Sequence, residues 1–533
     1  MTANKCGISC GSEHDISCVM PPSPELEAEI VAAKRRLLEG AAPYEAVQDT
    51  RLDPRSLVLI LARPSKTRAH TFVSQTQEFA TVVGDRRVLV LLVDFSDEAA
   101  TQNQGHYNEL LFSSGTYATG SMRDFYREAS YNKLNVIGSV SGTGGPTAGW
   151  YRAPQPKSYY TNGDYGFGQY PQNAQKLVED VTTLADPHVN FADYDNDGDG
   201  FVEALVIICA GSGAEVTGNT NDLWSHKWSI STRTIDGVKV RDYLMIPEDA
   251  RVGVCAHELG HLLMGWPDLY DTDYSSAGTG RWDLMAGGSW NNGGDTPAHP
   301  TNWCKYKVGW TDTVTINQQQ SVTLQPYATT PRIYKIPIGS ASSKEYFLVS
   351  NRQQAGFDSH LPGEGCVIEH VDDNRTNNTD ETHYLVDVEQ CDGRLDLNKN
   401  ANRGDATDPF PCGSNNSFGP NTTPSSRAYD GSDSEVSITN ITRSGDNITA
   451  NIDVGGAAAD GWNYNRAVTS TFASSDTQNA WAHIGGLGWR RIKNGAADGV
   501  TNMFEAFCDA ATNGRSVHVY ADSTFVYTVY LLA

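Results

Sequence analysis

The segment CAHELGHLLMGWPDLYD, residues 255–271, constrains the fold of this chain more than any other stretch. It places His257 and His261 four positions apart, with Glu258 directly after the first histidine. Residues four apart on an α-helix lie on one face, so both imidazoles can bind a single zinc ion. We therefore expect a helix here, buried in the floor of a cleft, with Glu258 beside a metal-bound water.

Length and charge limit the class of protein. A chain of 533 residues is too long for one ordinary core, so more than one domain is expected. The 64 acidic and 40 basic residues give a formal net charge of −24, which disfavours nucleic acid and anionic membranes as partners. No apolar run is long enough for a membrane span, and no signal peptide is recognisable at the start of the chain.

Apolar periodicity predicts the elements around this segment. Helical spacing with capping residues predicts helices over 24–39, 121–134 and 173–186. Continuous apolar runs predict buried strands at 86–97 and 203–211. Because helices and strands mix without strict alternation, we expect an α+β fold and not a doubly wound α/β fold.

The second half of the chain has a different pattern. Short β-branched runs separated by turn residues predict an all-β extension, and a glycine- and alanine-rich linker follows it. The aromatic-rich end predicts a small β-rich module, whose aromatic rings form its core or bind a glycan or surface. The chain is thus divided into an N-terminal region, a catalytic domain, a β-rich extension and a C-terminal module, at 1–80, 81–310, 311–455 and 461–533.

Asp268 is the leading candidate for the third metal ligand. Gly265 can end the helix in a left-handed conformation, after which the chain turns back toward the metal. Capping of a turn is the alternative role for Asp268, and the other candidate ligands are Asp271, Asp273 and His299. Three protein ligands and one water would make an open, catalytic zinc site.

Such a site needs further groups. Glu258 is the expected general base, and an oxyanion donor is also required. The candidate donors, between which the sequence does not choose, are His226, His299 and Tyr270. Met285 in RWDLMAGGSW is expected in a tight turn beneath the zinc ligands, unless it is an ordinary core methionine.

Two acidic loops are candidate calcium sites, with a solvated acidic turn as the alternative for each. The first, DYDNDGDGFVE, is similar to the first half of an EF-hand loop but lacks the closing glutamate. Its expected ligands are Asp195, Asp197, Asp199 and Glu203. The expected ligands of the second loop are Asp392, Asp396, Asp405 and Asp408.

Four cysteines fall into two kinds. Cys209 and Cys366 lie in strand-like runs and are expected to be buried thiols. Cys391 and Cys412 flank a polar loop, and they are a candidate disulfide if the protein is exported.

Taken together, these segments resemble the immune inhibitor A-type secreted zinc metalloproteases. Beyond HELGH, GWPDLYD and RWDLMAGGSW, the resemblance covers about residues 85–455 and includes VLVLLVDFSD, SMRDFYREASYNKLNVIGSV, DYDNDGDGFVEALVIICAGSGAE, LWSHKW, HPTNWCKYKVGW, EYFLVSNRQ and LPGEGCVIEHVDD. It implies a zincin fold, protein hydrolysis, bound calcium, export and a pro-segment. Carried over to this sequence, it makes His257, His261 and Asp268 the zinc ligands and Glu258 the base.

One spacing departs from the family pattern HExxHxxGxxD. Met264 stands at the glycine position, and Gly265 and Asp268 each come one residue late. One extra residue rotates a helix end by about 100°. Because the GWPDLYD segment is intact, we expect a local bulge or a looser turn to absorb this residue.

The resemblance also makes residues 1–80 a pro-segment that blocks the cleft. A thiolate from Cys6, Cys10 or Cys18 is a candidate for the open zinc position, and the simpler alternative is that these cysteines pair or are exposed.

The leading hypothesis is a secreted, calcium-stabilised zinc endopeptidase, made as a zymogen, that acts on proteins or peptides. One alternative is a catalytically silent binding or adhesion protein on the same scaffold. Another is a zinc hydrolase of a non-peptide bond. Glu258 argues against the silent protein, because a purely structural metal site has no use for it.

Overall fold

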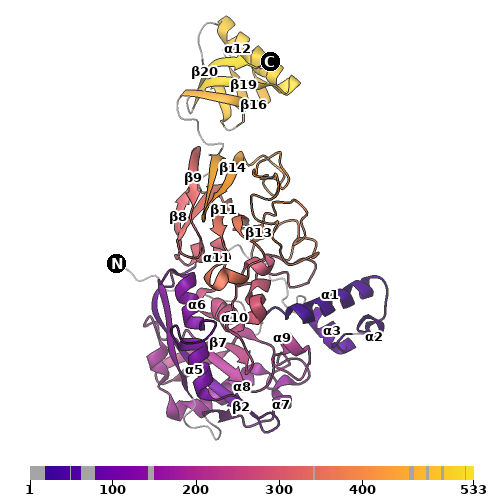
Figure 1. Cartoon of the computed structure of the whole chain (residues 1–533), viewed down its shortest axis with the longest axis vertical. Coiled ribbons are helices and arrows are strands. Elements are labelled where there is room, and N and C mark those ends of the chain that lie inside the picture. Colours follow the sequence, from indigo (N-terminus) through magenta and orange to yellow (C-terminus); the bar gives the residue numbers. More distant parts are fainter. Residues whose placement is uncertain are drawn as a thin grey trace.

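A computed structural model describes residues 18–48, 50–61, 79–141, 149–339, 342–454, 461–475, 479–485, 487–493, 497–521 and 524–532. Figure 1 shows an elongated molecule, with the mixed α+β part at one end, β-sheets in the middle and a small module at the other end. Cys6, Cys10 and most of the predicted linker lie outside the described residues.

The first half of the chain is built on a seven-stranded sheet of order β1-β6-β7-β5-β2-β3, with β4 paired to β2. Its strands are β1 (Cys18–Val19), β2 (Gly84–Asp94), β3 (Leu134–Ser141), β4 (Tyr151–Arg152), β5 (Leu205–Cys209), β6 (His226–Ile235) and β7 (Val238–Pro247). Strands β3, β2, β5 and β7 run parallel, whereas β6 is antiparallel to β7 and carries β1 on its outer edge. The sheet is therefore mixed, which confirms the α+β class.

The predicted buried strands and helices of this part are confirmed. β5 is buried along its whole length, as its continuous apolar run requires. The helices are α5 (Gln104–Phe112), α6 (Met122–Ala129), α7 (Lys157–Thr161), α8 (Ala174–Ala185), α9 (Ala214–Thr217) and α10 (Val252–Leu259). α6 ends earlier than the predicted 121–134, because Tyr131 and Asn132 adopt left-handed φ angles of 57° and 60°.

Three N-terminal helices lie against the flank of this part (Figure 1). They are α1 (Pro24–Leu38), α2 (Pro43–Ala46) and α3 (Pro54–Leu61). α1 confirms the predicted helix: Ser23 Oγ accepts from the Leu26 amide at 3.3 Å, which caps the first turn. Leu26 and Ile30, one turn apart, are fully buried in the same core as the large sheet.

The predicted β-rich extension contains two sheets. One has five strands, in the order β13-β12-β11-β10-β8, and the other three, in the order β14-β15-β9. Their bounds are β8 (Asp312–Thr315), β9 (Gln320–Leu324), β10 (Arg332–Pro337), β11 (Glu345–Arg352), β12 (Gly365–Asp372), β13 (Val386–Val388), β14 (Val436–Ser444) and β15 (Asn447–Val454). Cys391 and Cys412 form the predicted disulfide across the loop between the sheets, and Cys209 and Cys366 are buried free thiols.

The C-terminal module is a closed barrel of order β16-β17-β18-β20-β19 with its own core. Its strands are β16 (Gly461–Ala473), β17 (Ala480–Ile484), β18 (Gly488–Ile492), β19 (Ser516–Ala521) and β20 (Phe525–Leu531). A helix that the sequence analysis missed, α12 (Ala497–Asn513), packs on the barrel. Phe472, Trp489 and Tyr530 are exposed on its surface, and a glycan- or surface-binding role stays a prediction.

Among the described residues, no helix combines the length and the apolar character that crossing a bilayer requires.

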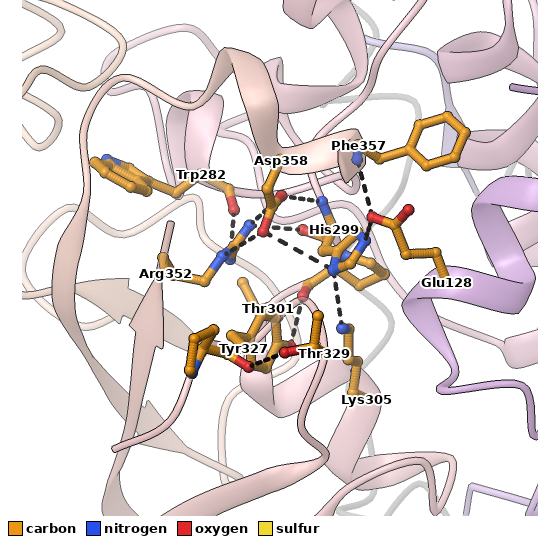
Figure 2. A network of polar contacts seen from close by, with 12 residues as sticks. Glu128, Trp282, His299, Thr301, Lys305, Tyr327, Thr329, Arg352, Phe357 and Asp358 are labelled. Carbon is orange, nitrogen blue, oxygen red and sulfur yellow. Dashed lines mark hydrogen bonds and ion pairs between the residues drawn. The ribbon is translucent and has the colours of Figure 1, made fainter. Parts of the chain in front are cut away.

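A buried polar network joins the mixed sheet to the extension (Figure 2). Arg352, at the end of β11, donates to both oxygens of Asp358 at 3.0 and 2.8 Å. Asp358 lies in the short helix η6 (Gly356–His360) and also accepts from the His299 amide at 2.8 Å. The His299 ring contacts Glu128 of α6 at 3.0 Å and Lys305 of α11 (Asn302–Lys307) at 3.2 Å. The centre of this connection is the fully buried Arg352–Asp358 ion pair, whereas Glu128 at its edge is partly exposed.

We expect Asp358→Asn to lower the free energy of unfolding by about 3–5 kcal/mol, because it leaves the buried Arg352 guanidinium without its counter-charge. Denaturant unfolding followed by tryptophan fluorescence measures this change. Asp312→Asn is the matched control: Asp312 pairs with Arg332 in solvent, and its loss is expected to change stability by no more than about 1 kcal/mol. Equal effects of the two variants would contradict the role given to the buried pair.

Candidate active site

The two histidines of the HELGH segment lie on a buried helix with their rings fixed from behind. His257 Nδ1 lies 2.9 Å from the Leu284 carbonyl oxygen, and His261 Nδ1 lies 2.6 Å from that of Trp266. A carbonyl only accepts, so each Nδ1 donates, and in the neutral form of each imidazole the lone pair is then on Nε2. The two Nε2 atoms are 3.0 Å apart. Backbone carbonyls commonly orient metal-binding imidazoles in this way.

Asp268 joins the two imidazoles. Its Oδ1 lies 3.3 Å from His257 Nε2 and 3.1 Å from His261 Nε2, and it has no other hydrogen-bond partner among the described residues. Ligand atoms around a tetrahedral zinc ion are about 3.3–3.4 Å apart, given metal–ligand distances of about 2.0–2.1 Å. The three side chains therefore fit a zinc ion in identity, number and spacing.

A π-helical turn absorbs the extra residue before Asp268. α10 ends at Leu259 and continues as the π-helix η3 (Gly260–Met264), after which Gly265 has a left-handed φ of 69°. A π-helical turn holds one more residue than an α-helical turn. The inserted residue can therefore be accommodated without rotating the residues that follow it away from the two histidines. The expected bulge therefore takes the form of a π-turn that contains the second histidine, His261.

Glu258 lies next to these ligands and is completely buried. Neither of its carboxylate oxygens has a hydrogen-bond partner among the described residues. Burial raises the pKa of Glu258 well above its usual range, since desolvation disfavours the charged form. An unpaired buried carboxylate is costly, which indicates a role for it outside the packing of the core.

The opposing effects of burial and neighbours set the charge of the ligands. Burial favours a neutral Asp268, but the two imidazoles outweigh this effect and lower its pKa below the usual value. Burial lowers the pKa of His257. For His261 the same effect is outweighed by Cys18 and Asp268, and its pKa is raised well above the usual value. The site therefore favours a negative Asp268 facing a positively charged centre.

The structure assigns other contacts to the alternative ligands. Asp271 accepts from Ser275 Oγ at 2.8 Å and from the Ser276 amide at 2.9 Å, and so orders its own loop. Asp273 forms an ion pair with Lys34 at 2.9 Å. His299 belongs to the network of Figure 2, where Glu128 and Lys305 contact its two ring nitrogens. Asp268, and none of these three, lies between the two imidazoles.

Of the three candidate oxyanion donors, the structure brings only Tyr270 to the metal-binding side. Its hydroxyl donates to the Val19 carbonyl oxygen at 2.9 Å. The His226 ring is fully buried and contacts the Trp224 carbonyl oxygen at 2.7 Å and the Tyr243 hydroxyl at 3.1 Å. His299 is held in the network described above.

Met285 is buried directly against the metal-binding helix. A Cβ added at Gly260 would lie 2.9 Å from Met285 Sδ, so glycine allows this close approach. The Met285 carbonyl accepts from the Leu269 amide at 2.9 Å, and the preceding Leu284 carbonyl accepts from His257. The turn therefore contacts the first histidine and the segment that carries Asp268.

A cysteine from the N-terminal segment also reaches the site. The Sγ atom of Cys18 and one ligand atom each of His261 and Asp268 all lie within 4.8 Å of one another. Cys18 is a free thiol in the structure. The sequence analysis did not choose between Cys6, Cys10 and Cys18, because residue type alone does not indicate which cysteine lies near the histidines.

The acidic loops form clusters as predicted, with one exception. The carboxylates of the first loop come together at Asp195, Asp197, Asp199 and Glu203. The second cluster contains Asp392, Asp396 and Asp405. The structure does not group Asp408 with them, because its carboxylate accepts from Trp282 Nε1 at 2.9 Å and from the Asp405 amide at 2.8 Å. Asp271, Asp273 and Glu381 form a further group that the sequence analysis did not single out.

The chain is similar in sequence to known proteins. Residues 74–315 match the family described as immune inhibitor A peptidase M6, catalytic domain. The chain is 34% identical over 287 positions to the pre-pro-metalloprotease PrtV of Vibrio cholerae serotype O1, covering 43% of this chain and 30% of that protein. It is 31% identical over 250 positions to immune inhibitor A of Bacillus thuringiensis subsp. alesti, covering 38% of this chain and 36% of that protein. The matches thus span about a third of the length of these relatives.

We expect Asp268→Ala to weaken zinc binding by more than about 100-fold, the upper range for the loss of a partner that only supports a ligand. Zinc per chain after dialysis against a competing chelator measures this effect. Asp271→Ala is the control, because it removes a neighbouring carboxylate that accepts hydrogen bonds from Ser275 and Ser276 and does not lie between the two imidazoles. Retention of zinc by the Asp268 variant together with its loss from the control would contradict the ligand assignment.

Proposed function

We propose that this chain, whose residues 74–315 belong to the immune inhibitor A peptidase M6 family, is a zinc-dependent endopeptidase that hydrolyses proteins or peptides. The observation that carries the proposal is the convergence of His257, His261 and Asp268 beside the unpartnered, buried Glu258. A structural zinc site has four protein ligands and no need of a base, whereas these residues supply three ligands and a base.

His257, His261 and Asp268 would hold the zinc ion. When bound, zinc supplies Lewis-acid chemistry: it polarises the scissile carbonyl and lowers the pKa of a water to about 7. The Leu284 and Trp266 carbonyls keep the two imidazoles in the tautomer that this arrangement needs. Met285 supports the same geometry from below, in the position expected of a methionine turn.

Glu258 is the general base in this proposal. Its two oxygens have no competing hydrogen bond among the described residues, so the carboxylate can accept the proton of the attacking water. It then delivers this proton to the leaving amine. A carboxylate suits both steps, since it changes its protonation state without leaving its place on the helix.

The edge strand β6 and Tyr270 are proposed to position the substrate. β6 is the outermost strand of the sheet apart from the two-residue β1, which pairs with it in antiparallel register. An extended peptide can add to such an edge through backbone hydrogen bonds. Because the Tyr270 hydroxyl already donates to a backbone carbonyl here, that of Val19, it is the preferred donor to the oxyanion.

Calcium is proposed to stabilise the acidic loops. In the first loop Asp195 accepts from the amides of Gly198 and Gly200 at 2.8 and 3.0 Å, which closes the turn and gathers the carboxylates. Repulsion between gathered carboxylates opposes folding, and a hard divalent cation would offset it. The second loop, with Asp392, Asp396 and Asp405, is the weaker candidate.

Export and a zymogen stage belong to the same proposal. The disulfide Cys391–Cys412 favours an oxidising compartment. The N-terminal segment enters the cleft through Cys18 and Val19, which supports a pro-segment.

A catalytically silent binding protein and a hydrolase of a non-peptide bond are the alternatives. Digestion of a protein substrate that phenanthroline abolishes would exclude both.

We expect Glu258→Gln to keep zinc but to lower kcat on a casein-type substrate by at least about 10²-fold, because the water loses its base. Tyr270→Phe removes only the hydroxyl and is expected to lower kcat by about 10²–10³-fold with zinc retained. Both variants are measured in the processed enzyme, with zinc content determined in parallel. Turnover by the Glu258 variant close to that of the parent would refute the assignment of the base.

We expect removal of calcium with a calcium-selective chelator to lower the melting temperature. Restoring calcium to about 100 times its Kd should raise the free energy of unfolding by about 2.7 kcal/mol for each occupied site. Asp195→Ala should lose most of this calcium-dependent gain, whereas Asp430→Ala, in an exposed turn elsewhere, should keep it. A calcium response unchanged in the Asp195 variant would remove the first loop from the proposal.

A further inference from the structure

The N-terminal segment enters the site as a short strand. β1 pairs with β6 in antiparallel register, with Cys18 opposite Lys227 and Val19 opposite His226. The Val19 amide donates to Asp268 Oδ2 at 3.5 Å, and the Val19 carbonyl accepts from Tyr270. This segment thus pairs with the edge of β6 and accepts the hydrogen bond of the Tyr270 hydroxyl, the two contacts that the proposed function assigns to the substrate.

Cys18 is the residue of this strand that faces the ligands. Its Sγ atom lies within 4.8 Å of a ligand atom of both His261 and Asp268. Asp268 Oδ1 has no hydrogen-bond partner among the described residues, and neither have the two carboxylate oxygens of Glu258, which directly follows His257 in the chain. A thiol is therefore held where the open coordination position of zinc is expected.

The residues that follow Cys18 anchor the strand to the cleft wall. The Met20 amide donates to the Ser225 carbonyl at 3.1 Å, and Trp224 Nε1 donates to the Met20 carbonyl at 2.8 Å. Trp290 Nε1 donates to the Pro21 carbonyl at 3.0 Å. These backbone contacts extend the register of β1 beyond its two residues. They fix the position of Cys18 independently of any metal.

Helix α1 holds the segment from outside the cleft. Glu27 pairs with Arg403 at 3.1 Å, and Lys34 pairs with Asp273 at 2.9 Å, on the loop that follows Asp268. A Cβ added at Gly218 would lie 3.0 Å from a Leu26 methyl carbon, so α1 packs closely on the end of α9. The helix therefore ties the strand to both the metal-binding segment and the extension.

We propose that the Cys18 thiolate is the fourth protein ligand of the zinc site in the unprocessed chain, and that it keeps the enzyme latent. Zinc strongly favours thiolate, and four protein ligands leave no position for water. Cys18 loses its proton to solvent on binding, and removal of the N-terminal segment exchanges the thiolate for water. The inference rests on the proposed function only in using its zinc ligands.

Cobalt substitution tests this ligand directly. The full chain is prepared with Glu258→Gln, so that it cannot cut itself, and is loaded with Co²⁺. A thiolate bound to Co²⁺ gives an intense charge-transfer band in the near ultraviolet, which histidine and carboxylate ligands do not give. We expect the band in this protein and its loss in Cys18→Ser and in Cys18→Ala. Cys508→Ser, which removes another partly buried free thiol in the C-terminal barrel, should keep it.

Thiol reactivity provides the second readout. With zinc bound, Cys18 should resist alkylation, and removal of the metal should expose it, as identified by peptide mass mapping. A band that persists in both Cys18 variants, or that only a Cys6 or Cys10 substitution abolishes, would overturn the assignment. So would a Cys18 found in a disulfide, or one alkylated equally fast with and without metal.

The two proposals fail in different ways. A processed chain that binds zinc but digests no protein would refute the peptidase, while the cobalt band would still establish Cys18 as a ligand. A fully active processed enzyme whose unprocessed form shows no thiolate band would refute only the role of Cys18. Unprocessed Cys18→Ala that is as inactive as its parent, although zinc-loaded, would separate metal ligation from latency and refute the latter.

Discussion

The structure of the site depends on the approach of three buried ligand atoms, His257 Nε2, His261 Nε2 and Asp268 Oδ1, to within 3.0–3.3 Å. Without a positive charge at their centre, this arrangement leaves two imidazole lone pairs and a carboxylate oxygen facing one another out of water. Backbone carbonyls of Leu284 and Trp266 impose the ring orientation from the other side. The surrounding contacts therefore hold these three candidate ligands in place, and Met285 packs closely against Gly260 of the same segment.

The position of the site in the sheet accounts for its access to extended chains. β6 is antiparallel to its neighbour β7 in an otherwise parallel set, and among the described strands only β1 pairs with its outer edge. An edge with unpaired amides and carbonyls accepts any extended segment of suitable register. In the structure, β1 of the N-terminal segment pairs with this edge, and this pairing places Cys18 near His261 and Asp268. Because this segment belongs to the same chain, its effective concentration at the edge is high, which favours pairing of β1 with β6.

Much of this arrangement follows from local sequence patterns. The apolar runs at 86–97 and 203–211 and the helical segments at 121–134 and 173–186 predicted strands and helices that the structure contains. The helix α12 was missed, and α6 was overextended across Tyr131 and Asn132. Both errors have one cause, since local propensity is weak where tertiary contacts decide whether an element forms or stops.

The sequence by itself determined the chemistry: two histidines one helical turn apart, a carboxylate between them, and an aspartate after a glycine turn. Helical periodicity is local, so residue spacing is enough to place the histidines on one face. Only the tertiary structure decided which aspartate, tyrosine and cysteine reach them. Asp268 depends on a π-turn, Tyr270 on the loop that follows, and Cys18 on pairing with a strand more than 200 residues away. Contacts between segments so distant are set by packing and strand register, which no local pattern specifies.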